Sequence, residues 1–194
     1  MFFFKHINIA NNNKCFLTFI LFYIIKLNIV YSQNSVYQKF YFDSKEVSSE
    51  GFLINGIPDG KWISYYENKN IKSEGFWKNS LLDSTWIFYD SSGRVTLEEN
   101  YSKNLKNGLS IFYDTIGFII KESNYVDGKK TGTELLYFTG TNKIKEENNF
   151  KNGIKDGVSL EYDKNRQLIT IYNFDMGVVY KKEEINRLDS EGNK

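Results

Sequence analysis

The sequence feature that most constrains the fold is a regular spacing of aromatic residues. A shift of 24 residues superimposes six tyrosines, which are separated by 24, 24, 24, 24 and 25 positions: Tyr41, Tyr65, Tyr89, Tyr113, Tyr137 and Tyr162. A second aromatic column runs in phase with them at separations of 24 or 25 positions: Phe52, Phe76, Tyr101, Tyr125, Phe150 and Phe174. A period of this length predicts an array of repeated supersecondary units.

Each unit is predicted to contain a β-hairpin. Turn-forming dipeptides recur in phase with the aromatic columns, at Asn55-Gly56, Asn79-Ser80, Asp127-Gly128 and Asn152-Gly153. Asn, Asp and Gly accept the positive φ angles of tight hairpin turns. A column of mostly glycines precedes the returning strands, at Gly60, Ser84, Gly108, Gly132 and Gly157. The expected fold is therefore all-β, an elongated single-layer antiparallel sheet of about five to six hairpin repeats.

The returning strand of the first unit places Ile63 and Tyr65 on one face and Trp62 and Tyr66 on the other, because side chains alternate along a strand. The aliphatic–tyrosine pair recurs in the later units, which predicts that its face is the buried one. If the second aromatic column shares that face, its rings fill the gaps between the tyrosines. The two columns would then form one continuous aromatic ladder with a structural role.

The later units carry a recognisable motif. The segments 125–137 and 150–162 both read aromatic-x-x-Gly-x-x-x-Gly followed by a tyrosine. This pattern resembles the MORN repeat, and more specifically the bacterial MORN variant that is often labelled as an antitoxin-type protein. The resemblance extends over residues 41 to about 180. It implies an elongated, single-layer antiparallel sheet that is used for interaction rather than for chemistry.

The first 32 residues look like an export signal. Lys5 and Lys14 stand in an acid-free leader, and Phe16–Ile25 is an apolar run. Cleavage near Ser32 would release a secreted or periplasmic protein. An uncleaved anchor is the alternative, but it needs about 18–20 apolar residues, and 16–30 supplies fewer. The predicted organisation is a signal peptide (1–32), an N-terminal half-repeat cap (33–50), the repeat array (51–180) and a polar tail (181–194).

Composition narrows the chemistry. The sole histidine and the sole cysteine are His6 and Cys15, both inside the predicted signal peptide, so the mature chain would lack both. That excludes serine–histidine triads, thiol nucleophiles, disulfides, and zinc sites built on imidazole or thiolate. The mature chain would hold 25 − 3 = 22 basic residues against 24 acidic ones, a net charge of −2 without a basic cluster. We therefore expect no nucleic-acid partner, no cofactor, no metal site and no enzymatic activity.

Two side-chain groups are candidates for interaction. Trp62, Tyr66, Trp86 and Phe88 form the candidate binding face, because no other segment is left to cover them. The alternative, which stays open at this point, is that the first units pack against residues 33–47. Five glutamates spaced by 24 residues are interpreted as a solvated row: Glu50, Glu74, Glu98, Glu122 and Glu146.

The sequence thus favours a non-catalytic, exported scaffold that binds a protein or a glycan in the bacterial envelope. Two alternatives remain, a peripheral membrane protein and an antitoxin-like neutraliser of a partner protein. A membrane surface is not favoured for a chain of charge −2. Self-association through the open sheet edges is a further possibility.

Overall fold

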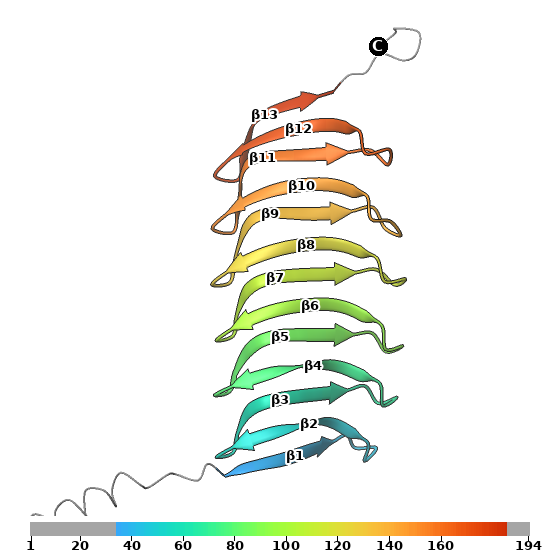
Figure 1. Cartoon of the computed structure of the whole chain (residues 1–194), viewed down its shortest axis with the longest axis vertical. Helices are drawn as coiled ribbons and strands as arrows, with labels where there is room; N and C mark the ends of the chain where they lie inside the picture. Colours follow the sequence, from blue (N-terminus) through green and yellow to red (C-terminus); the bar gives the residue numbers. More distant parts are fainter. Residues whose placement is uncertain (1–33, 186–194) are drawn as a thin grey trace, which may run out of the picture. The chain divides into compact units, whose positions relative to one another are not determined.

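The computed structural model describes residues 34–185 (Figure 1). This part of the chain contains no helix and folds as one open antiparallel sheet of 13 strands, whose order in the sheet is their order in the sequence. The first seven strands are β1 (Ser35–Tyr41), β2 (Val47–Ile54), β3 (Ile57–Tyr65), β4 (Ile71–Lys78), β5 (Leu81–Tyr89), β6 (Val95–Ser102) and β7 (Leu105–Tyr113). The other six are β8 (Ile119–Val126), β9 (Lys129–Tyr137), β10 (Ile144–Lys151), β11 (Ile154–Tyr162), β12 (Leu168–Asp175) and β13 (Val178–Glu184).

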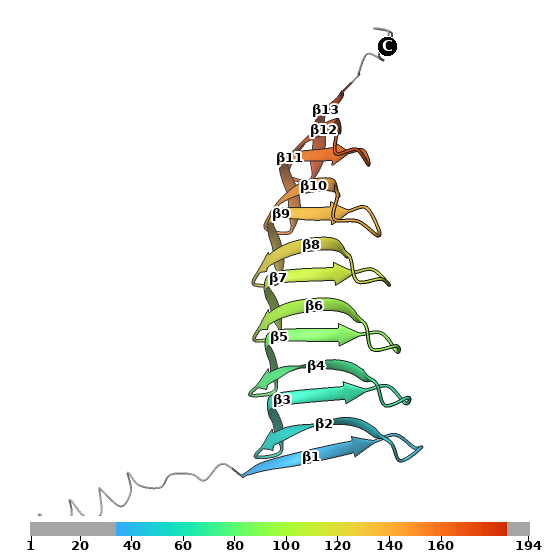
Figure 2. The same cartoon turned by 45° about the vertical axis from the view of Figure 1, so that its right-hand side comes forward.

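The predicted all-β, single-layer antiparallel sheet is confirmed. Figure 2 shows β13 almost end-on while β1 is still seen side-on, so the strand direction rotates along the sheet, as the right-handed twist of strands requires. The predicted signal peptide (1–32) lies outside the described residues. The last strand continues to Glu184, beyond the predicted end of the array at residue 180.

The hairpins turn on the predicted dipeptides. Asn55 and Gly56 have φ angles of 52° and 82°, and the other predicted turns adopt the same left-handed pair. Two further turns of this kind were not predicted, at Lys103-Asn104 and Met176-Gly177. Lys103 (φ 50°) and Met176 (φ 46°) lack the usual turn chemistry, so their backbone is set by the sheet around them rather than by their own preference.

The glycine column marks a β-bulge. On β2, Gly51 pairs with Trp62 and Leu53 pairs with Pro58 of β3. Phe52 alone therefore lies opposite three residues of β3, 59–61, and the middle one is Gly60 with a φ of 90°. The bulge of each hairpin is bonded to the turn of the next. The amide of the later turn donates to a carbonyl of the earlier hairpin at 2.8–3.0 Å, as Ser80 to Pro58, Asn104 to Leu82, Gly128 to Lys106, Gly153 to Lys130 and Gly177 to Lys155.

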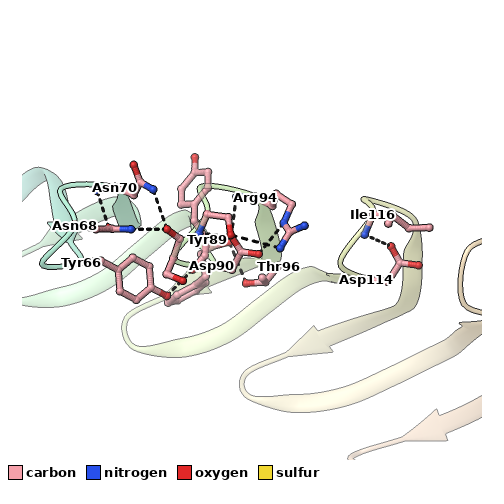
Figure 3. Close-up of polar contacts among 12 residues, drawn as sticks. Tyr66, Asn68, Asn70, Tyr89, Asp90, Arg94, Thr96, Asp114 and Ile116 are labelled. Carbon is pink, nitrogen blue, oxygen red and sulfur yellow. Dashed lines mark hydrogen bonds and ion pairs between the residues drawn. The ribbon is translucent and has the colours of Figure 1, made fainter.

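The loops at the other ends of the strands, away from the hairpin turns, also connect neighbouring repeats. Asn68 and Asn70 both donate their side-chain amides to the carbonyl of Ser91 in the next loop, at 2.7 and 2.8 Å (Figure 3). In three of the loops an aspartate caps the turn by accepting from two backbone amides, as Asp90, Asp114 and Asp163 do. Several neighbouring repeats are therefore joined at both ends of their strands.

The sheet has two distinct faces. We call the first the tyrosine face, because it carries Tyr65, Tyr89, Tyr113, Tyr137 and Tyr162. We call the other the tryptophan face. Its middle row comprises, in strand order, Gln38, Gly51, Trp62, Gly75, Trp86, Glu99, Ser110, Ser123, Glu134, Asn148, Ser159 and Tyr172.

The prediction of one continuous aromatic ladder is wrong. Counted from the hairpin turn, Phe52 and Phe76 stand one residue earlier than Tyr101, Tyr125, Phe150 and Phe174. Because side chains alternate, Phe52 and Phe76 lie on the tyrosine face and the other four lie on the tryptophan face. The residues equivalent to Tyr101 in the first two hairpins are Leu53 and Trp77.

The most buried side chains lie in the middle row of the tryptophan face and not beside the tyrosines. The Trp86 indole is 5% exposed and donates to the carbonyl of Phe76 at 3.1 Å. Its ring lies directly over Gly75, and the Trp62 ring lies in the same way over Gly51. A glycine at these two positions is needed for space, since neither has a positive φ.

This packing predicts that Gly75→Ala destabilises the protein. The added β-carbon would overlap Cδ2, Cε2 and Cγ of Trp86, which should cost about 1–3 kcal/mol of unfolding free energy. Denaturant unfolding of the variant measures this loss. In the double variant Gly75→Ala/Trp86→Leu the overlap is removed, so its loss should be smaller than the sum of the two single losses. Additive losses would contradict the packing described here.

Candidate functional site

On the tyrosine face, each tyrosine is bonded to a glutamate fifteen residues earlier. Tyr65 donates to Glu50 at 2.6 Å, and four further pairs repeat the contact at 2.7–2.9 Å: Tyr89–Glu74, Tyr113–Glu98, Tyr137–Glu122 and Tyr162–Glu147. These carboxylates alternate with aliphatic side chains along the middle of the face, as Glu50, Ile63 and Glu74 do. The glutamates are therefore structural acceptors rather than a merely solvated row.

The prediction that Glu146 is the last member of the glutamate row is wrong. Glu146 lies on the tryptophan face, and Glu147 takes its expected place. The loop before it, residues 138–143, has one residue more than the other loops of the array, so a fixed step of 24 selects the neighbouring side chain. The extra residue is visible in the sequence as the single 25-residue interval, between Tyr137 and Tyr162.

These pairs shift the acidities of both partners. Lys61, which lies 2.9 Å from Glu74, and then Tyr89 hold the pKa of the Glu74 carboxyl below its usual value of 4.5. Burial, followed by the hydrogen bond to Glu74, raises the pKa of Tyr89 from 10.0 to about 12. Hydrogen bonds from Lys39 and then Tyr65 likewise hold the pKa of the Glu50 carboxyl below 4.5.

The tryptophan face changes character along the sheet. Its first repeats are aromatic, with Trp77 and Trp86 packed edge to face at a centroid distance of 5.6 Å. Its later repeats contain buried ion pairs. Glu99 is paired with Lys106 and accepts from Ser110, and Glu134 is paired with Lys130 and accepts from Ser123. Both carboxylates are less than a tenth exposed.

The lysines of these repeats also contact aromatic rings. The Lys106 ammonium lies 5.4 Å from the ring centre of Tyr125, Lys130 lies 4.4 Å from Phe150, and Lys155 lies 5.1 Å from Phe174. The four rings assigned to a structural ladder in the C-terminal half therefore form a row with lysines between them. This row accounts for the second aromatic column by cation–π contact instead of ring stacking.

The four residues of the candidate binding face do not form an exposed patch. Trp86 is buried, and Trp62 packs against Phe40 of β1 at 6.0 Å, which favours the alternative that the first units pack against residues 33–47. Phe88 lies 6.3 Å from Trp86. Tyr66 lies in the loop after β3 and donates to the carbonyl of Tyr89 at 2.8 Å (Figure 3).

Three exposed aromatic residues of the first repeats lie on the tyrosine face. We define the aromatic patch as Tyr37, Phe52 and Phe76, which are 48%, 43% and 47% exposed. Tyr37 and Phe52 pack edge to face at 5.0 Å, and Lys61 is the cross-strand neighbour of Phe76. The longer interval from Phe52 to Gly60 than from Tyr101 to Gly108 was the sequence signal for this placement.

The chain matches a protein-family model over part of its length. Residues 58–79 match the family model described as a MORN repeat variant. No curated protein gave a significant match. The matched segment spans β3 and β4, and the other hairpins repeat their geometry. The match supports a MORN-repeat protein, and the MORN repeat suggests a repeat-based interaction scaffold.

Two further observations concern residues 34–185 only. No helix there is long and apolar enough to cross a membrane. No group of three or more His, Cys, Asp or Glu side chains in that part of the chain is placed to hold a metal ion.

The tyrosine–glutamate pairs predict a stability maximum with an acid limb and an alkaline limb. A lowered Glu74 pKa favours the folded state above pH 4.5, and this contribution is lost as the pH falls through the folded value. A raised Tyr89 pKa contributes fully below pH 10.0 and is lost as the pH rises toward about 12. Denaturant unfolding at a series of pH values tests both limbs.

The matched variants are Glu74→Gln and Tyr89→Phe. Glu74→Gln should weaken the acid limb, because the amide has no charge to lose, while Tyr89→Phe should weaken the alkaline limb. Ultraviolet titration of the native protein should show phenols that ionise well above pH 10. A native protein in which every tyrosine ionises near pH 10 would contradict the assignment.

Proposed function

We propose that this protein is a non-catalytic, exported scaffold that binds a protein or glycan partner in the cell envelope through the aromatic patch. The observation that carries the proposal is the exposure of Tyr37, Phe52 and Phe76 on a single-layer sheet, where no second layer within residues 34–185 covers their face. Tyr37 and Phe52 are in contact, and Lys61 separates them from Phe76. Exposed aromatic surface is typical of interaction sites, since it gains free energy when a partner removes it from water.

A protein is the partner class that the surroundings of the patch favour. The patch begins on β1, which pairs only with β2 among the described strands and exposes Val36 and Tyr41. An unpaired strand edge can accept a strand of a partner through main-chain hydrogen bonds, with the neighbouring rings as side-chain contacts. The opposite edge strand, β13, carries the charged run Lys181–Glu184, which disfavours such pairing there. A second copy of the chain could use the β1 edge in the same way.

The absence of catalysis is part of the proposal. The carboxylates at the centre of the tyrosine face are held by tyrosine hydroxyls and lysines, and those of Glu99 and Glu134 are held in buried ion pairs. Carboxylates engaged in this way are not poised as an acid–base pair around a substrate. Residues 34–185 include no histidine or cysteine.

The patch predicts that Phe52→Ser/Phe76→Ser abolishes partner capture while the protein stays folded. Both rings are exposed, so their loss should change unfolding free energy little, whereas a partner loses its main apolar contact. The matched control is Leu109→Ser/Val158→Ser, which removes two comparably exposed apolar side chains from the same face further along the sheet. Crosslinking in the native cells followed by affinity purification measures capture. Equal capture by both variants would remove the aromatic patch from consideration.

Export predicts a mature chain that begins near Gln33 and is found in the secreted or envelope fraction. N-terminal sequencing of the purified native protein checks the cleavage site, and fractionation checks the compartment. A full-length chain in the cytoplasm would instead favour the antitoxin-like role, because an exported protein cannot guard a cytoplasmic target. Sedimentation with anionic vesicles tests the membrane-associated role, for which a charge of −2 predicts no binding.

A further inference from the structure

A cavity of about 300 Å³ opens on the tryptophan face between β10 and β13. It lies in the last repeats of the sheet, far along the strand order from the aromatic patch. Lys155, Asn148 and Ser159 line one part of it, and Glu146, Glu161 and Tyr172 line another.

The two preceding repeats each hold a buried carboxylate in this part of the tryptophan face. In each of them, a buried glutamate carboxylate in the middle row accepts hydrogen bonds from a lysine and from a serine in the same hairpin. In the first set the carboxylate is on the first strand of the hairpin, Glu99, with Lys106 and Ser110 on the second strand. In the other set the carboxylate is on the second strand, Glu134, together with Lys130, and Ser123 is on the first strand. The lysine and the serine together form a carboxylate-binding pair that is filled from within the chain.

The next hairpin keeps the lysine and the serine but lacks the carboxylate. Counted from the hairpin turn, Asn148 is equivalent to Glu99. On the second strand, Lys155 is equivalent to Lys106, and Ser159 is equivalent to Ser110. The Lys155 ammonium is bonded to the neutral side-chain oxygen of Asn148 at 2.8 Å. Ser159 is 3% exposed, and its hydroxyl has no hydrogen-bond partner within the described part of the chain.

The buried Ser159 hydroxyl without a partner is energetically unfavourable, because it loses hydration and makes no hydrogen bond in return. The half-buried Lys155 ammonium has a neutral oxygen as its hydrogen-bond acceptor and is attracted by Glu146 from further away. A carboxylate that enters the cavity would satisfy both. The contacts of Glu99 show that a lysine and a serine at these two positions hold a carboxylate.

The other part of the cavity has the opposite requirement. Glu146 and Glu161 are direct cross-strand neighbours, and like charges in that relation are destabilising. Lys145 lies 3.1 Å from Glu146 and offsets part of this charge. Lys155 also attracts Glu146, and Lys182 attracts Glu161. An ammonium group between the two carboxylates would contact both directly, with Tyr172 supplying an aromatic wall.

We propose that this cavity binds a small zwitterionic ligand of the amino acid type. Its carboxylate is held by Lys155 and Ser159, and its ammonium group by Glu146 and Glu161. The inference is independent of the proposed scaffold function, because it uses a different face and different repeats.

The test is calorimetric and NMR titration of the purified protein with a series of probes: glycine, β-alanine, 4-aminobutyrate, acetate and methylamine. We expect at least one of the three amino acids to bind more tightly than both acetate and methylamine, with shifts centred on the amides around Ser159. The series varies the distance between the two charges, so the tightest member reports their separation in the site. No saturable binding, or amino acids that bind no better than acetate, would overturn the proposal.

Two variants connect binding to the cavity. Ser159→Ala should raise the dissociation constant at least about tenfold, the factor expected when one hydrogen bond to a charged group is lost. Asn148→Glu should abolish binding, because it places a carboxylate in the chain where Glu99 has one. The control is Lys151→Gln, which removes an exposed charge from the same strand outside the cavity and should leave the dissociation constant unchanged. A folded Asn148→Glu variant that binds as tightly as the original protein would also overturn the proposal.

Discussion

The constraint on which the whole structure depends is that a single-layer sheet has no second layer to bury its side chains. Each face must shield its own middle row with the side chains that flank it. The tryptophan face achieves this with indoles over glycines in the first repeats and with lysine–glutamate pairs under aromatic rings in the later ones. The tyrosine face does so by bonding each phenol to a carboxylate on the neighbouring strand.

This constraint explains why charged groups are among the most buried side chains. Glu99 and Glu134 lie deeper than most aliphatic residues of the sheet, yet each is matched by a lysine and a hydroxyl. Desolvation of such a carboxylate is tolerated only when its hydrogen bonds are made within the fold. At Asn148 an amide takes the place that the Glu99 carboxylate has in its hairpin. The strand pairing continues there, and a cavity opens on the same face.

The sequence was sufficient for the architecture because the repeat period, the turn dipeptides and the strand alternation all report on the backbone. It failed where one inserted residue changed which face a side chain occupies. Phe52 and Tyr101 look equivalent in a 24-residue alignment, but their distances from the turn differ by one residue, and this places them on opposite faces. The tyrosine–glutamate pairs and the burial of Trp86 depend on cross-strand neighbours, which spacing along one chain does not reveal.

The bond from each hairpin turn to a carbonyl of the hairpin before it has a consequence for how such proteins diverge. The main-chain bond at these junctions between units is alike, so a whole unit can be duplicated or deleted without losing the backbone contact between its neighbours. The distance between features at the two ends of the sheet would then change only in discrete steps. Evolution can therefore adjust the spacing between two bound molecules by counting units, without redesigning either of the surfaces that hold them.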